Sequence, residues 1–194
     1  MAIILCQFLS SQDNQRDDTY GGSLENRTRL IHEIIDGIAV QCGDEFIIGL
    51  RLSPERFGMR LDEVIPLAQQ FIDSDHLDFL DMSLWDCFKM IDDPAYQDQS
   101  LISAFTELDR KDVLLTVAGK IYQPYDAIKC MQAGVDFVTP GRVAIVHHDY
   151  PKQVAQNSSF KPETLPVTRA HLRQEGLSEK FIDYMSSWAD FVED

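Results

Sequence analysis

Four short runs of apolar and β-branched residues recur through the middle of the chain. They are FIIGLRLS at 46–53, LDFLDMS at 77–83, VLLTVAG at 113–119 and VDFVTPG at 135–141. None alternates cleanly between apolar and polar residues, which is typical of strands that are buried on both faces. This series of runs constrains the fold more than any other feature of the sequence.

Helical patterns fill the intervals between the runs. Residues 24–41 place leucine and isoleucine at helical spacing, and Ser23 is predicted to be the N-cap of that helix. Residues 61–74 form a second helical pattern, in which Pro66 is unfavourable and is expected to bend or shorten the helix. Further helices are predicted at 97–109, 124–133, 166–175 and 178–192.

Strand and helix therefore alternate about every 22 to 36 residues, which predicts right-handed βαβ units, a parallel sheet and an α/β fold class. After Pro151 the sequence changes to a polar segment, KQVAQNSSFKPETLP, which we interpret as a linker. We predict a domain at 1–150, followed by this linker and a helical tail at 151–194. In the last helix Ser178 is the expected cap, and one face is expected to carry Phe181, Met185 and Trp188.

Composition excludes several classes of protein. The formal charge of −15 argues against a nucleic-acid partner, because phosphate backbones attract positive charge. No run approaches the roughly 20 apolar residues of a membrane span, and MAIILCQFL lacks the basic flank of a signal peptide. The four cysteines are scattered without a CxxC pair, which predicts reduced thiols in a cytoplasmic protein.

Chemistry in parallel α/β folds collects where the strands end. The first run ends with Arg51, a charged residue in an apolar strand that is costly to bury without a partner. Two interpretations stay open: an ion pair with Asp81 or a helix carboxylate, or an anion or electron-rich ligand bound at the strand end.

The third and fourth runs both end in a glycine that precedes a basic residue. Such glycines let backbone N–H groups approach a ligand, and consecutive amides favour phosphate. An arginine adds two parallel hydrogen-bond donors. These two endings predict a phosphate site; their residues are Ala118, Gly119 and Lys120, and Pro140, Gly141 and Arg142.

The segment NQRDDTYGGSLENRTRL at 14–30 carries a more specific signal. Within it, RDDTYGGSLENRTR closely resembles the pattern R-x-D-x-[YW]-G-G-S-x-E-N-R-x-R of the Old Yellow Enzyme family, whose members are NAD(P)H-dependent, FMN-containing ene-reductases. The preceding LCQFLSSQDN resembles L-x-Q-F-L-S-P-x-x-N of that family. GLRLSP, VAGKI and PGRVAI follow in the family's order, so that the resemblance covers roughly residues 3 to 151.

The resemblance implies a TIM-type (β/α) barrel of eight parallel strands, with FMN at its C-terminal mouth, NADH or NADPH as reductant and a small activated alkene as substrate. Arg51 would contact the pyrimidine side of the flavin ring. The phosphate would be held by Gly119, Gly141 and Arg142, near the backbone of Ala118 and Lys120. Structural roles in fixing a loop and the entry to the helix at Leu24 would fall to Arg16, Tyr20, Glu25, Asn26 and Arg27.

The family's substrate-binding pair and proton-donating tyrosine lie in H-x-x-[NH]-G-Y, immediately before L-L-x-Q-F-L. Alignment on Q-F-L places Ile3 at the tyrosine, Ala2 at the glycine and Met1 at the second substrate-binding residue. The first four strands would precede the chain. The expected fold is therefore an incomplete half-barrel, strands five to eight plus C-terminal helices, with no catalytic residue and no metal ligand of its own.

An unclosed sheet exposes its edge and its interior, which favours self-association. We therefore expect a homo-oligomer or a complementary half-barrel as partner; the other interpretation is a remnant that folds marginally. Three functions stay open: an FMN-binding part of an ene-reductase, a half-barrel that recognises only phosphate, and a non-catalytic interaction module.

The family's A-N-P-D-W-P is replaced here by VHHDYP at 146–151. Adjacent side chains point in different directions on most backbones. We therefore expect His147 and His148 to face solvent or cap a helix, with a shared metal site as the alternative.

Overall fold

The structure is a computed structural model that describes residues 4–43, 45–96 and 98–193. The chain divides into two compact units. Unit 1 comprises Met1–Gly119 and Cys130–Thr139, and unit 2 comprises Lys120–Lys129 and Pro140–Asp194.

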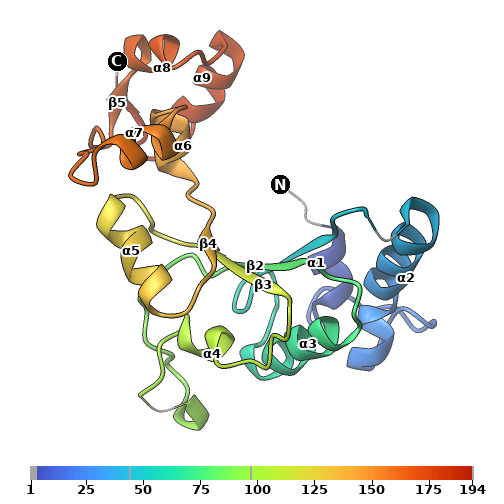
Figure 1. The fold of residues 1–194 in the computed structure, drawn as a ribbon. Coiled ribbons are helices and arrows are strands. Elements are labelled where there is room, and N and C mark those ends of the chain that lie inside the picture. The colour runs from blue at the N-terminus through green and yellow to red at the C-terminus, as the bar shows by residue number, and fades with distance from the viewer. Residues whose placement is uncertain (1–3, 44, 97, 194) are drawn as a thin grey trace. The chain divides into compact units, whose positions relative to one another are not determined.

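Unit 1 is built on a parallel sheet with the strand order β1-β2-β3-β4 (Figure 1). The predicted parallel sheet is therefore confirmed, although the strands are shorter than the apolar runs. Residue pairs align across the sheet in rows, such as Arg51 with Asp81 and Asp81 with Thr116. The strands are β1 (Gly49–Leu52), β2 (Phe79–Ser83), β3 (Leu114–Ala118) and β4 (Phe137–Val138).

The expectation that every strand is buried on both faces is wrong for β1 and for β4, in which neither residue is buried. In β1, Leu50 and Leu52 are buried, whereas the alternate residues Gly49 and Arg51 are exposed. The reason is that α3 (Leu61–Asp73) and α4 (Ser103–Thr106) lie on one face of the sheet (Figure 1), and the alternate residues of this edge strand point away from that face.

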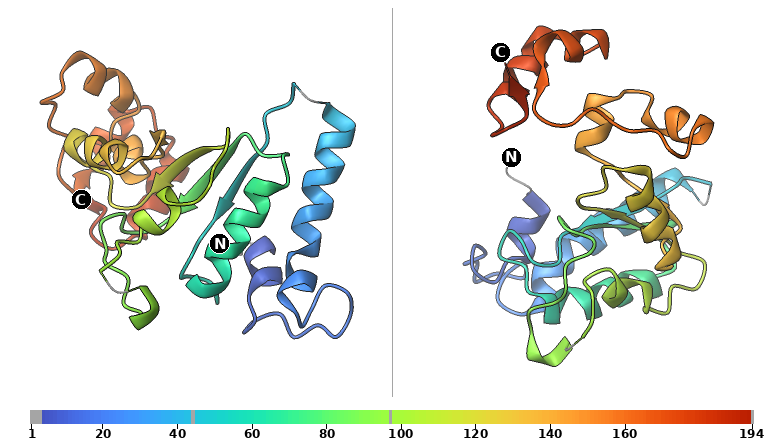
Figure 2. Two further views of the ribbon diagram at one scale, coloured as in Figure 1. Left: turned by 60° about the horizontal axis from the view of Figure 1, so that its bottom comes forward. Right: turned by 90° about the vertical axis from the view of Figure 1, so that its left-hand side faces the viewer.

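The helices of unit 1 follow their sequence patterns closely in two cases. α2 (Leu24–Cys42) begins after Ser23, whose hydroxyl accepts the N–H of Asn26, so the predicted N-cap is confirmed. α3 continues through Pro66 instead of ending there. Its apolar face buries Leu67 and Phe71, and α2 and α3 run side by side in both views of Figure 2. The short α1 (Ile4–Leu9), which the sequence did not predict, packs against α2.

The helix predicted at 97–109 is wrong in extent. Among the described residues of that interval, 98–109, the one helix is α4, a single turn that buries Ala104 and Phe105, and a 3₁₀ turn, Pro94–Tyr96, precedes it. A segment this short presents one turn of apolar residues to the sheet and has no further apolar stripe to bury. The predicted helix at 124–133 is observed as α5 (Pro124–Gln132).

Unit 2 has its own apolar core, which includes Val146, Leu172, Ile182, Met185 and Phe191. Two short strands, β5 (Val167–Thr168) and β6 (Val192–Glu193), pair in parallel. The helices of this unit are α6 (Arg142–Val146), α7 (Tyr150–Gln156), α8 (Arg169–Gln174) and α9 (Glu179–Ser186).

Three predictions about this region need correction. The segment interpreted as a linker begins with α7, because Tyr150 at its start is buried and anchors an otherwise polar turn. The helix predicted at 166–175 starts later, since Val167 pairs with Val192. In α9 the buried residues are Ile182 and Met185, while Phe181 is 40% exposed.

The Ser178 cap of α9 is confirmed, since its hydroxyl accepts the N–H of Phe181. No disulfide joins any of Cys6, Cys42, Cys87 and Cys130 in the described chain. Among the residues that the structure describes, no helix is long and apolar enough to cross a membrane.

Candidate functional site

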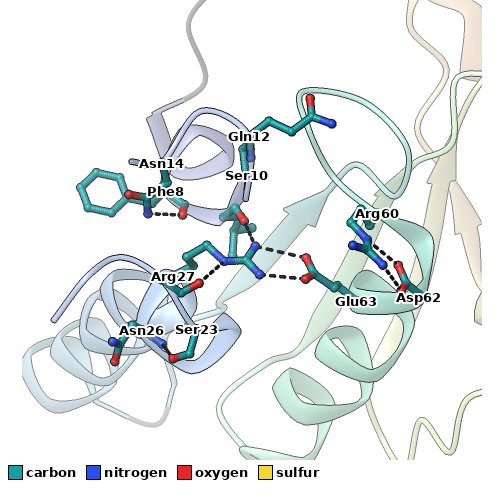
Figure 3. Close-up of polar contacts among 12 residues, drawn as sticks. Phe8, Ser10, Gln12, Asn14, Ser23, Asn26, Arg27, Arg60, Asp62 and Glu63 are labelled. Carbon is teal, nitrogen blue, oxygen red and sulfur yellow. Dashed lines mark hydrogen bonds and ion pairs between the residues drawn. The ribbon is translucent and has the colours of Figure 1, made fainter. Parts of the chain in front are cut away.

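The YGGSLENR segment forms a hydrogen-bonded loop that leads into α2. The Asn14 side-chain amide donates to the carbonyl oxygens of Phe8 and Tyr20, both at 2.7 Å. The Asn26 amide donates to the carbonyl of Gly21 at 3.0 Å (Figure 3 draws Asn14 and Asn26 beside Arg27). These contacts fix the loop and the helix entry, as the resemblance implied.

Arg27, in the first turn of α2, connects this loop to neighbouring helices. Its side chain is only 5% exposed and makes a double hydrogen bond with Glu63, at 2.8 and 3.1 Å (Figure 3). It also donates to the carbonyls of Leu9 and Gly22. One guanidinium therefore joins α1, the loop, α2 and α3, and the predicted structural role of Arg27 is confirmed.

Arg51 forms the ion pair that the sequence offered as one explanation. Its Nε lies 2.7 Å from Oδ2 of Asp81 on the neighbouring strand. The Asp81 side chain is 10% exposed, but that of Arg51 is 57% exposed, so the arginine is not buried in the described chain. The pair leaves most of the guanidinium accessible at the carboxyl end of β1.

Gly119 is required by close backbone packing. The N–H groups of Leu84 and Trp85 donate to the carbonyl of Ala118, and that of Cys87 donates to the carbonyl of Gly119. A Cβ on Gly119 would lie 2.7 Å from the backbone of Trp85, and its φ of +154° is one that side-chain-bearing residues rarely adopt. Backbone hydrogen bonds therefore join the end of β3 to the turn that follows β2.

Gly141 and Arg142 open α6 in unit 2. No heavy atom lies within 4 Å of a Cβ placed on Gly141, so its backbone can be approached closely. The Arg142 guanidinium lies 5.9 Å from the ring centre of Trp188, and within the described ranges no carboxylate pairs with it. Lys120, the first residue of unit 2, has a left-handed φ of 52°.

The predicted site residues are divided between the two units. Arg51, Ala118 and Gly119 lie at the carboxyl ends of strands in unit 1, and Lys120, Gly141 and Arg142 lie in unit 2. The aligned positions Met1, Ala2 and Ile3 fall outside the described residues.

Sequence reasoning missed an aromatic surface at the same end of the sheet. Trp85 is 48% exposed, the Arg56 guanidinium lies 4.3 Å from its ring centre, and Phe57 lies 6.1 Å away. A signal was present, because Trp85 closely follows the end of the second apolar run, and functional residues of parallel α/β folds lie at strand ends.

Two histidines and Glu175 cluster in unit 2, with potential ligand atoms of His147, His171 and Glu175 within 4.8 Å of one another. The N–H of Glu163, however, donates to Nε2 of His147 at 2.9 Å. The neutral ring then carries its proton on Nδ1 and offers no second lone pair to a metal. His147 also caps the end of α6 through its backbone N–H. The capping role predicted for His147 is therefore observed.

His148 pairs with Glu175, whose Oε2 lies 2.7 Å from Nδ1 and accepts the His148 backbone N–H at 2.9 Å. Burial raises the pKa of Glu175, but the His148 hydrogen bonds outweigh it and the net pKa is below its usual value. Burial lowers the pKa of His147.

Both shifts predict that acid destabilises the chain. Each group is more readily deprotonated in the folded state. The stability it contributes is therefore present above its unfolded pKa and lost as pH falls toward its folded pKa. Loss should begin below about pH 6.5 with His147 and continue below about pH 4.5 with Glu175. Urea midpoints measured from pH 7 to 3.5 should fall, and E175Q should flatten the lower part of that curve; an unchanged slope in E175Q would contradict the assignment.

Comparison with known proteins places the chain in a family. Residues 3–160 match the NADH:flavin oxidoreductase / NADH oxidase family. Cinnamate reductase of Clostridium sporogenes is 28% identical over 180 residues, covering 81% of this chain and 27% of that protein. NADH oxidase of Thermoanaerobacter brockii is 29% identical over 160 residues, covering 79% of this chain and 25% of that protein. The solved structure of morphinone reductase superimposes with a TM-score of 0.63 at 28% identity, covering 87% of this chain and 44% of that structure.

This chain belongs to the NADH:flavin oxidoreductase / NADH oxidase family. The predicted resemblance to Old Yellow Enzymes is confirmed, and the matched family is one of NADH:flavin oxidoreductases. The parallel sheet agrees with part of an α/β barrel. The chain spans less than half the length of each of these three relatives.

Proposed function

We propose that this chain is the FMN-binding, C-terminal half of an NAD(P)H-dependent ene-reductase barrel. Residues 1–150 would supply strands five to eight, and 151–194 the helical tail. The observation that carries the proposal is Arg51: it lies in the family segment GLRLSP, at the carboxyl end of β1, with its guanidinium accessible and held by a neighbouring carboxylate.

The residues of each unit fit parts of FMN. Arg51 offers positive charge to the electron-rich pyrimidine side of the flavin ring. For the phosphate, Gly141 offers an open backbone and Arg142 a guanidinium with no carboxylate partner among the described residues. The backbone of Ala118, Gly119 and Lys120 would complete the set.

When bound, FMN supplies the hydride chemistry, accepting hydride from NADH or NADPH and passing it to an activated alkene. This chain's part would be to bind and orient the cofactor, with Arg51 stabilising negative charge on the ring. The aligned positions for substrate binding and proton donation hold Met1 and Ile3, so we propose no catalytic residue in this chain.

We also propose that a second half-barrel covers the open face of the sheet, supplied by another copy of this chain or by a complementary chain. Ile47 is 70% exposed, Leu114 48% and Phe137 37%. Phe79 of β2 and Phe137 of β4 pack with ring centres 5.9 Å apart. Exposed apolar surface of this kind favours association.

The test is flavin retention. The purified chain is mixed with FMN, desalted and examined by absorption, and the same sample is run in sedimentation equilibrium. We expect a retained flavin band and a mass above that of a monomer. R142A should bind FMN about 10- to 100-fold more weakly, because a hydrogen bond to a charged group is lost. R173A, an arginine that already pairs with Glu179, is the matched control and should bind normally.

A colourless wild-type chain would overturn the FMN proposal. Thermal protection by inorganic phosphate equal to that by FMN would favour a half-barrel that recognises only phosphate. A flavin-loaded monomer would contradict the second half-barrel and the interaction-module interpretation.

A further inference from the structure

Asp81 joins three strands on the face of the sheet that lies away from α3. Its Oδ2 accepts the Nε–H of Arg51 from β1 at 2.7 Å. Its Oδ1 accepts the hydroxyl of Thr139, just beyond β4, at 3.2 Å. Each carboxylate oxygen therefore has one partner, and the carboxylate plane is fixed from both sides.

The two partners of the ion pair, Asp81 and Arg51, differ in exposure. Asp81 is almost fully buried, so its charge must remain paired, whereas more than half of the Arg51 side chain is exposed. Only Nε of Arg51 is held by Asp81. Among the described residues, neither terminal nitrogen of Arg51 has a protein partner. Because a guanidinium is planar, holding Nε sets the direction of both terminal nitrogens.

The hydroxyl of Thr139 is not needed to hold the backbone beyond β4 in place. The backbone N–H of Thr139 already donates to the carbonyl of Val117 and fixes the chain beyond β4. The hydroxyl therefore adds nothing to the sheet ladder, and its described hydrogen bond is to Asp81. Without it, Oδ1 of a nearly buried carboxylate would lose its partner, and the Asp81 side chain would gain rotational freedom.

We propose that Thr139, acting through Asp81, is a positioning residue that sets the orientation of Arg51 toward the flavin ring. This inference rests on the proposed function, in which Arg51 stabilises negative charge on the flavin. The reduced flavin is the more negatively charged form. Orientation of Arg51 should therefore matter more for binding reduced FMN than oxidised FMN.

The test is T139V, which preserves shape and net charge and removes only the hydroxyl. Dissociation constants are measured for oxidised FMN by fluorescence quenching and, anaerobically, for dithionite-reduced FMN. We expect T139V to weaken binding of reduced FMN about 3- to 10-fold more than binding of oxidised FMN, a smaller effect than in R142A because the lost hydrogen bond is to Asp81 and not to the flavin. T139S retains a hydroxyl and should restore the wild-type ratio. D81N is less useful, because it also changes the charge beside the flavin.

A double-mutant cycle identifies the route. If Thr139 acts through Asp81 and Arg51, T139V should leave the ratio unchanged in the R51K background. An equal effect in that background would overturn the inference. So would a T139V protein with a lower thermal midpoint and an unchanged ratio, because Thr139 would then be structural only. A wild-type chain that binds no FMN would overturn the proposed function itself, and this inference with it.

Discussion

R27A should destabilise the chain by about 3–4 kcal/mol, because it breaks a buried ion pair. The Arg27 guanidinium is nearly fully buried and pairs with Glu63 through two hydrogen bonds. Its removal leaves the carbonyls of Leu9 and Gly22 without their donor and leaves Glu63 unpaired. Urea unfolding followed by circular dichroism measures the change.

The matched control for R27A is R60A. Arg60 pairs with Asp62 through two hydrogen bonds, as Arg27 does with Glu63 (Figure 3), but its side chain is 58% exposed. Exposed pairs contribute little because both partners are well solvated when separated. R60A should therefore leave the unfolding midpoint close to wild type. Equal losses in the two variants would show that burial does not decide the strength of the Arg27 pair.

G119A is the second substitution with a large expected effect, a loss of about 2–4 kcal/mol. The new methyl group would lie 2.7 to 2.8 Å from backbone atoms of Trp85 and Asp86, and backbone cannot rotate away as a flexible side chain does. The φ of +154° adds strain for any residue with a Cβ. The thermal midpoint of the variant measures the loss.

Gly37 provides the opposite case for the same substitution. It lies inside α2, and nothing lies within 4 Å of a Cβ placed there. G37A should stabilise the chain by about 0.5–1 kcal/mol, because alanine has the higher helix propensity. An unchanged midpoint in G119A would show that the packing between Gly119 and the Trp85 turn does not hold in solution, and a loss of stability in G37A would contradict the open space around Gly37.

The predicted helices that extend too far share one feature, which is that residues near their ends pair with other segments, as Ser100 does with Met90. The pattern at 97–109 and the helices predicted at 166–175 and 178–192 each extend further than the observed elements. In each case the polar and apolar spacing is compatible with a helix, but the tertiary structure uses the flanking residues otherwise. Val167 and Val192, for example, pair as strands. Local propensity yields to pairing when pairing buries apolar surface.

The surroundings of Arg51 show which contacts can be predicted from residue types alone and which cannot. The sequence predicts a charged residue at a strand end and offers Asp81 as one of its partners, and that pair is observed. The exposure of Arg51 and the bond from Thr139 to Asp81 were not predicted. Thr139 lies 58 residues from Asp81 along the chain, and no period or motif links the two.

The sequence by itself determined that the strands run parallel, which family the chain belongs to, and the caps at Ser23 and Ser178. Each of these depends on local periodicity or on a contiguous motif. Only the tertiary structure decided that Arg27 pairs with Glu63, 36 residues away, and that Gly119 packs against the Trp85 turn. Only it fixed the proton of His147 on Nδ1, through the N–H of Glu163. These features depend on which distant segments come into contact when the apolar faces of strands and helices are buried, and that choice leaves no repeating pattern along the chain.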